Sequence, residues 1–323
     1  MTRITLLAVG LTLLAPAAAS AQDPPPVPPP APAPPPPPTI TMEAKRVLGA
    51  GKDAIVLRKR PFRVQGTLTP VVAGQQVELW RYVDGKRRQT VRVPVAPDGT
   101  FALRMPARHQ GRVSVRAFHA ATPELGEATG PKVSVQVVEP RASAGASGAL
   151  VRLLQRGLHR LRYAVPRNGR FDDATGRAMM AFRKVNGMAR SYDANRAVIA
   201  RVLAGKGAFK PRHPHAGRHV EADISRQVLA LIDHGKVVAT YHTSSGAPGT
   251  STVIGSFRVY LKTPGYNAKG MLDSNYFIRG YAIHGYVDVP AFNASHGCLR
   301  VPLADAARIF AWLHLGDRVI VYP

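Results

Sequence analysis

Two histidines and the single cysteine of this chain fall within fifteen residues of one another. They occupy two short segments, Tyr281-Ala282-Ile283-His284-Gly285 and, after an interval of nine residues, Ser295-His296-Gly297-Cys298-Leu299-Arg300, so that ten residues separate His284 from Ser295. A thiol attacks a carbonyl carbon as the thiolate, and its unperturbed pKa of about 8.5 leaves little thiolate at neutral pH. Because a neighbouring imidazole can accept the thiol proton, a Cys–His pair predicts a nucleophile for acyl transfer.

Each of these residues also has an ordinary structural interpretation. Cys298 is either an inert core thiol or an accessible nucleophile, largely activated near neutral pH. His284 is either a satisfied core histidine or the base, and Arg300 is either an ion-pair partner or a substrate contact. Gly297 suits a close approach of the backbone to a substrate, where amides could stabilise an oxyanion. A lone thiol in an exported chain is either a leftover or a reactive group, and the inert core thiol would be favoured without the motif that surrounds Cys298.

The elements that must position these residues are mostly strands. Alternating apolar residues predict strands from His219 onward, at 255–262, at 276–284 and at 318–322. A helix is expected to begin at Pro302 and to run to about Leu313. Residues 217–323 are therefore predicted to form a mostly-β catalytic domain with one late helix.

This C-terminal segment resembles the catalytic domain of L,D-transpeptidases of the YkuD type. The family's fingerprint is a histidine, a variable gap, and then Ser/Thr-His-Gly-Cys-aliphatic-Arg/Asn, which residues 295–300 satisfy at every position. The upstream segment Thr252-Val253-Ile254-Gly255-Ser256-Phe257 matches the family's Thr-Pro-x-Gly-x-Phe pattern, except that Val253 replaces the proline. That substitution affects a turn.

The resemblance implies a cysteine acyltransferase that acts on peptidoglycan stem peptides without a cofactor or metal. Cys298 would attack the bond between the third stem residue and the terminal D-alanine, and an amine of a second stem (giving a 3→3 cross-link) or water would resolve the acyl-enzyme. His284 would be general base and acid, oriented by the carbonyl of Gly285, and His296 would have a structural or oxyanion-related role. Ser295 and Arg300 would hold the loop and meet the donor's carboxylate. The other expected substrate contacts are Gly297, Gly280, Arg279 and Tyr276, with a structural role favoured for Tyr276 and Arg279.

Residues 147–206 change from strand to helix periodicity. Leu150, Leu153, Leu154, Leu158 and Leu161 follow helical spacing. Together with Asn168-Gly169-Arg170-Phe171-Asp172 and Thr175, they resemble the three-helix peptidoglycan-binding domain of wall enzymes. Asp172 or Asp173 is expected to cap the second helix, and Asp193 to open the third.

The first 140 residues predict three further segments. Residues 1–21 read as a signal peptide, with Arg3, a short apolar run and a small-residue cleavage site. Residues 22–39 are a proline-rich linker of polyproline II character. Residues 40–140 alternate in period two between turn signals, which predicts an immunoglobulin-like β-sandwich. The chain is thus expected to be exported to the cell envelope, with no transmembrane span.

Charge is distributed unevenly. Lys and Arg outnumber Asp and Glu by 17 to 8 in residues 39–140 and by 16 to 3 in 141–215, but only by 10 to 7 in 216–323. A basic surface attracts polyanions. In an exported protein, anionic cell-wall polymers are a more reasonable partner than nucleic acid, although a high arginine content also serves solubility.

Three other functions compete with the transpeptidase. A zinc peptidase would need about three ligands, which Cys298, His284 and His296 could supply. A non-catalytic wall-binding or adhesion protein would carry a decayed site, against which the intact motif argues. Nucleic-acid binding is disfavoured by the export signal. The neighbouring His213, His215 and His219 do not have the spacing of a metal site.

Overall fold

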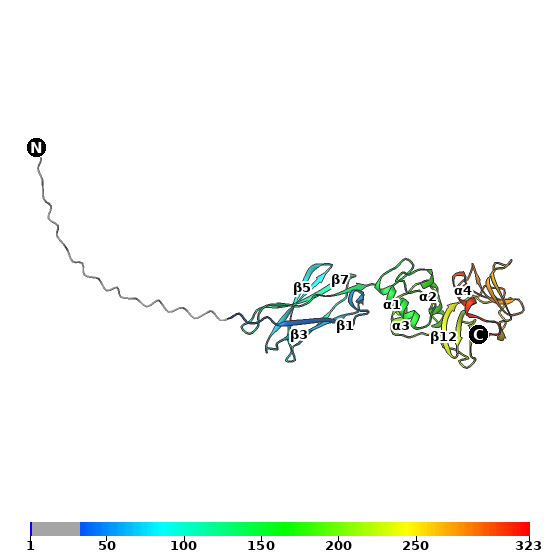
Figure 1. Cartoon of the computed structure of the whole chain (residues 1–323), viewed down its shortest axis with the longest axis horizontal. Helices are drawn as coiled ribbons and strands as arrows, with labels where there is room; N and C mark the ends of the chain where they lie inside the picture. Colours follow the sequence, from blue (N-terminus) through cyan, green and yellow to red (C-terminus); the bar gives the residue numbers. More distant parts are fainter. Residues whose placement is uncertain (2–32) are drawn as a thin grey trace.

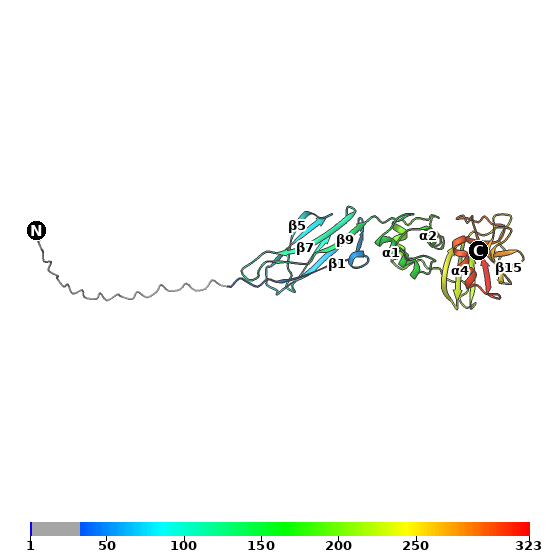
Figure 2. The same cartoon turned by 45° about the horizontal axis from the view of Figure 1, so that its top comes forward.

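The computed structural model describes residue 1 and residues 33–323, which form three units in a row (Figure 1, and turned by 45° in Figure 2). The predicted signal peptide and most of the proline-rich linker lie outside the described residues. In residues 33–323 no helix is long and apolar enough to cross a bilayer.

The N-terminal unit consists of two β-sheets with one core between them. One sheet has the order β1-β3-β6, and the other β2-β9-β7-β4-β5, with β8 paired to β7. Val64, Leu68, Val77, Leu79 and Val115 are buried in this core and alternate with exposed residues, as the period-two pattern predicts. The strands are β1 (Thr39–Lys45), β2 (Ile55–Leu57), β3 (Phe62–Thr69), β4 (Gln76–Val83), β5 (Lys86–Pro94), β6 (Thr100–Met105), β7 (Gly111–His119), β8 (Ala128–Thr129) and β9 (Val133–Val138), with a short 3-10 helix, η1 (Gly51–Asp53), before β2.

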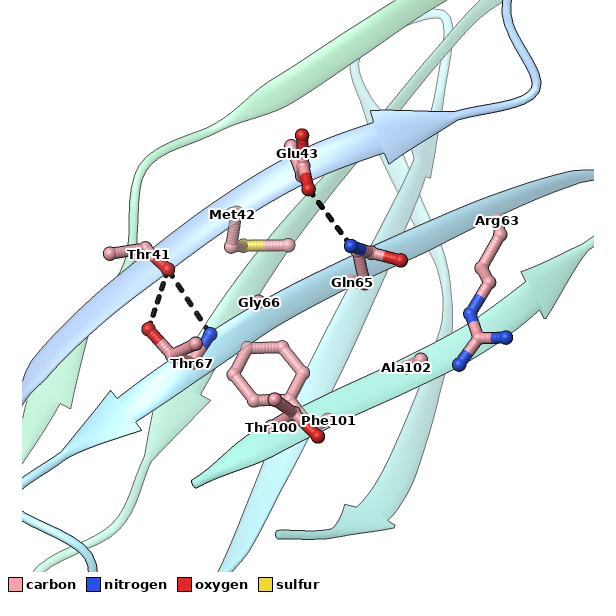
Figure 3. A pocket seen from close by; sticks show the side chains of 10 residues that line it. All are labelled: Thr41, Met42, Glu43, Arg63, Gln65, Gly66, Thr67, Thr100, Phe101 and Ala102. Atoms are coloured by element: carbon pink, nitrogen blue, oxygen red, sulfur yellow. Dashed lines mark hydrogen bonds between the residues drawn. The ribbon is translucent and has the colours of Figure 1, made fainter. Parts of the chain in front are cut away.

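A shallow cavity lies on the β1-β3-β6 sheet (Figure 3). Its polar side chains bond to one another: Thr41 and Thr67 share a hydrogen bond of 2.7 Å, and Gln65 donates to Glu43 at 2.8 Å. These bonds satisfy the polar groups across the strand pair, so this surface needs no ligand to explain it.

The second unit contains three helices, α1 (Ala149–Arg160), α2 (Asp173–Val185) and α3 (Arg196–Leu203). Leu154, Leu158, Met179, Phe182 and Ile199 are buried in their common core. Asp172 caps α2 by accepting a hydrogen bond from the Thr175 amide at 2.9 Å. The third helix begins later than predicted: Asn195 is its cap, since its side chain accepts from the Val198 amide, and the Asp193 prediction was wrong by two residues.

The third unit contains a five-stranded sheet, β12-β11-β10-β18-β13, and a four-stranded sheet, β14-β15-β16-β17. Helix α4 (Leu303–Trp312), which begins directly after Pro302 as predicted, contributes Ala306 and Ile309 to the core shared by these sheets. The mostly-β prediction with one late helix is confirmed for this unit. The strands are β10 (His219–Asp223), β11 (Val228–Asp233), β12 (Lys236–His242), β13 (Gly255–Arg258), β14 (Leu261–Tyr266), β15 (Leu272–Ile278), β16 (Tyr281–Tyr286), β17 (Leu299–Pro302) and β18 (Arg318–Tyr322).

The helical and C-terminal units are joined by more than the linker between them. The segment after α1 adds to the edge of β12, because the Thr240 amide donates to the Arg162 carbonyl at 2.8 Å and the Ala164 amide donates back to Thr240 at 3.2 Å. Arg177 of α2 pairs with Asp305 of α4 at 3.0 Å, and both side chains are largely buried. In addition, Phe209, which lies between α3 and β10, packs on β11. The two units therefore share an interface with a buried ion pair.

Candidate active site

A cavity of about 810 Å³ lies beside strands β15 and β16. It brings together most of the residues predicted from the sequence, and it adds a group that the sequence motif did not indicate, from the loop between β14 and β15. The predicted residues at the cavity are Cys298, His284, His296, Ser295, Arg300, Tyr276, Arg279 and Gly280; the loop adds Asn267, Ala268, Lys269 and Met271, and β16 adds Tyr281 and Tyr286.

Strand pairing sets the position of the thiol. Strands β16 and β17 are parallel, with His284 opposite Arg300 and Ile283 opposite Leu299. Cys298 immediately precedes β17, so its side chain lies beside the start of β16. There the Ala282 amide donates to Cys298 Sγ at 3.5 Å, and the thiol contacts the Gly280 carbonyl at 3.8 Å. The pairing of β16 with β17 therefore brings the two motifs together in space.

The imidazole of His284 is buried, with an exposed fraction of 3%. Its Nδ1 lies 2.9 Å from the Gly285 carbonyl oxygen, which can only accept a hydrogen bond. This contact assigns the proton to Nδ1 and leaves Nε2 free to accept one. Burial lowers the pKa of His284; the hydrogen bond to Gly285 opposes that shift and the charge of Arg300 adds to it. The imidazole is therefore neutral at neutral pH and able to act as a base.

The thiol of Cys298 is half-buried, and burial raises its pKa. The Ala282 amide and the charges of Arg300 and Lys269 counteract this shift without reversing it. Activation of Cys298 near neutral pH therefore stays a prediction, and in the resting site it would depend on a base. Desolvation disfavours the thiolate, so the proton has to leave the sulfur as the substrate is attacked.

Ser295 holds the turn before the cysteine rather than facing a substrate. Its hydroxyl donates to the Cys298 carbonyl at 2.6 Å and accepts from the Gly297 amide at 3.1 Å. Its backbone carbonyl accepts from the Ala247 amide at 2.8 Å and the Thr250 hydroxyl at 2.9 Å. With the side chain buried and both hydroxyl functions used, Ser295 is a structural residue at the edge of the cavity.

Two glycines of the motifs are required by packing. Gly297 has φ of +109°, and a Cβ there would lie 1.9 Å from a ring carbon of Tyr281. A Cβ on Gly285 would lie 2.7 Å from Ala306 Cβ, where α4 packs on β16. Neither glycine lines the cavity. The prediction that Gly297 allows a close approach is supported, but the approaching group is the Tyr281 ring and not a substrate.

Arg300 combines several contacts. Its guanidinium lies over the Tyr286 ring at 4.2 Å, and Tyr286 in turn packs edge-on against the His284 ring at 5.6 Å. A carboxylate oxygen of Asp288 is 4.0 Å away, but that side chain is mostly exposed. Arg300 is thus held by an aromatic ring beside the imidazole, with only a distant ion pair to compete for its charge.

The remaining predicted residues lie at the open side of the cavity. His296, Arg279 and Gly280 are exposed, and Tyr276 is partly buried. Tyr276 accepts a hydrogen bond from the Asn267 side chain at 3.2 Å, and Asn267 also accepts from the amides of Lys269 and Met271. This network orders the β14–β15 loop against the cavity. Sequence reasoning missed the loop because its residues belong to no motif.

Among residues 33–323, no group of three His, Cys, Asp or Glu side chains has an arrangement that could hold a metal ion. This holds for Cys298, His284 and His296 together, so the geometry does not favour the zinc peptidase.

Comparison with known proteins agrees with the sequence motif. The sequence profile of the YkuD L,D-transpeptidase catalytic domain matches residues 217–321. The solved structure of an L,D-transpeptidase from Xylanimonas cellulosilytica is 31% identical over 57% of this chain and 98% of that one, with a TM-score of 0.53. This chain belongs to the L,D-transpeptidase family. The match to the solved structure is longer than the profile match, so the similarity extends beyond the catalytic domain.

A second solved structure, of an L,D-transpeptidase from Stackebrandtia nassauensis, is 20% identical over 56% of this chain and 95% of that one, with a TM-score of 0.35. No curated protein matches the chain.

The packing of Gly297 against Tyr281 generates the first prediction. Gly297→Ala combines a left-handed backbone with an overlap on the ring, and we expect it to lower the free energy of unfolding by about 2–5 kcal/mol. Gly280→Ala is the matched control, since Gly280 has open space around it and no positive φ. Urea denaturation of both variants measures the difference; equal stabilities would show that the Tyr281 contact is not tight.

Proposed function

We propose that this L,D-transpeptidase works by covalent catalysis, with Cys298 as nucleophile and His284 as general base and acid. One observation carries the proposal: a thiol and a neutral imidazole with a free Nε2 line the same cavity, and the Gly285 carbonyl fixes the tautomer of that imidazole. A Cys–His pair of this kind can form and resolve a thioester.

In the first step, Cys298 Sγ attacks the carbonyl carbon between the third stem residue and the terminal D-alanine. The thiol proton passes to His284 Nε2, which then protonates the departing amine of D-alanine as the tetrahedral intermediate collapses to the thioester. In the second step, an amine of another stem attacks the thioester and gives a 3→3 cross-link, or water attacks and gives the trimmed stem. A thiol and an imidazole that are both neutral at rest fit this order of steps, because the proton moves from Cys298 to His284 only as the attack proceeds.

The oxyanion of each intermediate needs hydrogen-bond donors. The Gly297 amide is already engaged by Ser295 Oγ, so we assign this role to another group of the same turn. The exposed His296 side chain lines the cavity. It makes no hydrogen bond or ion pair within residues 33–323, which supports an oxyanion-related role over a structural one.

The charge of the cavity supports a carboxylate-bearing donor. Lys269, Arg279 and Arg300 line it, and none of the lining residues is Asp or Glu. Stem peptides carry free carboxylates, including that of the terminal D-alanine. Cations fixed in a partly desolvated cavity attract such groups more strongly than exposed ones do.

We also propose a role for each remaining part of the chain. Residues 1–21 would direct export to the cell envelope, and residues 22–39 would be a spacer. Residues 40–140 would be an immunoglobulin-like module, supported by the three-stranded and larger sheets that enclose one core. Residues 147–206 would bind peptidoglycan, with their excess of basic residues favouring anionic wall polymers.

The reaction is tested by its products. Purified protein incubated with disaccharide-tetrapeptide stems should release D-alanine and form tetrapeptide–tripeptide dimers, which tandem mass spectrometry identifies by a bond between two third-position residues. Release of D-alanine without dimers would restrict the proposal to hydrolysis. Dimers linked through a fourth-position residue would contradict it.

The two motif histidines should differ in effect. We expect His284→Ala to slow acylation of Cys298 by about 10²–10⁴-fold, the usual contribution of a general base, while His296→Ala keeps measurable turnover. Since the pKa of His284 is lowered, the base form persists as pH falls, and the acidic limb of the rate profile should lie below pH 6.5. Stopped-flow acylation rates measured against pH check both statements. An active His284→Ala beside an inactive but folded His296→Ala would reverse the roles.

A further inference from the structure

The catalytic turn rests on a short segment that we call the strap, residues 243–246, which follows β12. The amide of Ser244 donates to the Arg300 carbonyl at 3.0 Å and the Arg300 amide donates back at 3.0 Å. The Ser245 carbonyl accepts from the amides of Ala294 and Ser295, each at 2.9 Å. Both ends of the turn that carries Cys298 are therefore bonded to the strap.

Thr243 begins the strap and contacts both the turn and the helical unit. Its hydroxyl donates to the Arg300 carbonyl at 2.6 Å. Its own carbonyl accepts a hydrogen bond at 2.9 Å from the ammonium of Lys184, which comes from the last turn of α2. A chain of contacts thus runs from the helical unit through Thr243 to Arg300, two residues after the nucleophile.

The amine of Lys184 is buried at a point where its main contact is the strap. Lys184 has an exposed fraction of 3%, and burial, with the charge of Arg190 adding to it, lowers its pKa to about 7. Asp305, a carboxylate on the catalytic side of this interface, is already paired with Arg177. Burying this amine costs desolvation, which its hydrogen bond to the buried Thr243 carbonyl offsets only in part.

We propose that Lys184 is a positioning residue for the transpeptidase reaction, holding the strap and thereby the turn of Cys298 from across the interface between units. The inference rests on the proposed function of Cys298. Its consequence is that the helical unit contributes to the chemistry as well as to any binding of the wall. Small displacements of a nucleophile relative to its base lower the rate steeply.

The test compares full-length Lys184→Met, Lys184→Arg and Arg183→Met. Methionine removes the donor and keeps the length, while arginine keeps a donor. Arg183 is the matched control: it is the neighbouring residue on α2, is also buried, and donates only within the helical unit, to the carbonyls of Asp193 and Ala189 at 2.9 Å each. Steady-state kinetics on tetrapeptide stems and thermal unfolding are measured for each protein, with Cys298→Ser as the inactive reference.

We expect Lys184→Met to lower kcat by about tenfold or more with KM within about twofold, and to remain folded at the assay temperature even though the Thr243 carbonyl loses its donor. Lys184→Arg should recover most of kcat. Arg183→Met should unfold earlier and keep kcat within about threefold of the wild type.

A fully active Lys184→Met would overturn the positioning role while leaving the function of Cys298 intact. An unfolded Lys184→Met, or one whose loss of rate matches that of Arg183→Met, would also overturn it, because Lys184 would then be structural only. A wild-type protein as inactive as Cys298→Ser would instead refute the proposed function.

Discussion

Strands β16 and β17 run parallel, and their register, with His284 opposite Arg300, determines where every candidate reacting group lies. The pairing brings Cys298 to the start of β16, where the Ala282 amide reaches its sulfur. The features around it maintain this register: Gly285 admits helix α4, Gly297 admits the Tyr281 ring, and Ser295 ties the turn to itself. Most residues of the motif are therefore needed for the packing that holds one thiol and one imidazole in place.

Burial keeps both groups neutral at rest. It raises the pKa of Cys298 and lowers that of His284, so a preformed thiolate–imidazolium pair is disfavoured from both sides. A neutral pair protects the lone thiol from oxidation, which proceeds through the thiolate. Two cations of the cavity, Arg300 and Lys269, oppose the rise in the pKa of the thiol, and a bound substrate that excludes water would strengthen their effect.

The sequence was enough to predict motifs and helix starts, but it did not predict contacts between segments that lie far apart in the chain. The late helix after Pro302 and a cap at Asp172 or Asp173 could be predicted because helix starts depend on neighbours a few residues away. The motif also predicted that Cys298 and His284 lie at one site, and both line the same cavity. Ser295 was expected both to hold the loop and to meet the donor, but the motif does not show that the hydroxyl's partners are the carbonyl and amide of its own turn. Lys184 gave no signal at all, since its partner Thr243 lies 59 residues away. The β14–β15 loop was missed as well, because its residues belong to no sequence motif.

The central claim is that Cys298 is the acyl-accepting nucleophile, and the mass of the intact protein after incubation with a carbapenem tests it most directly. The strained lactam offers an acyl group to the donor site, so the wild type should gain the mass of one drug molecule, with and without a chelator. Cys298→Ser should keep the fold and gain none, because a hydroxyl is far harder to deprotonate than a thiol. An adduct of equal stoichiometry on Cys298→Ser, or one that disappears with a chelator, would contradict the account.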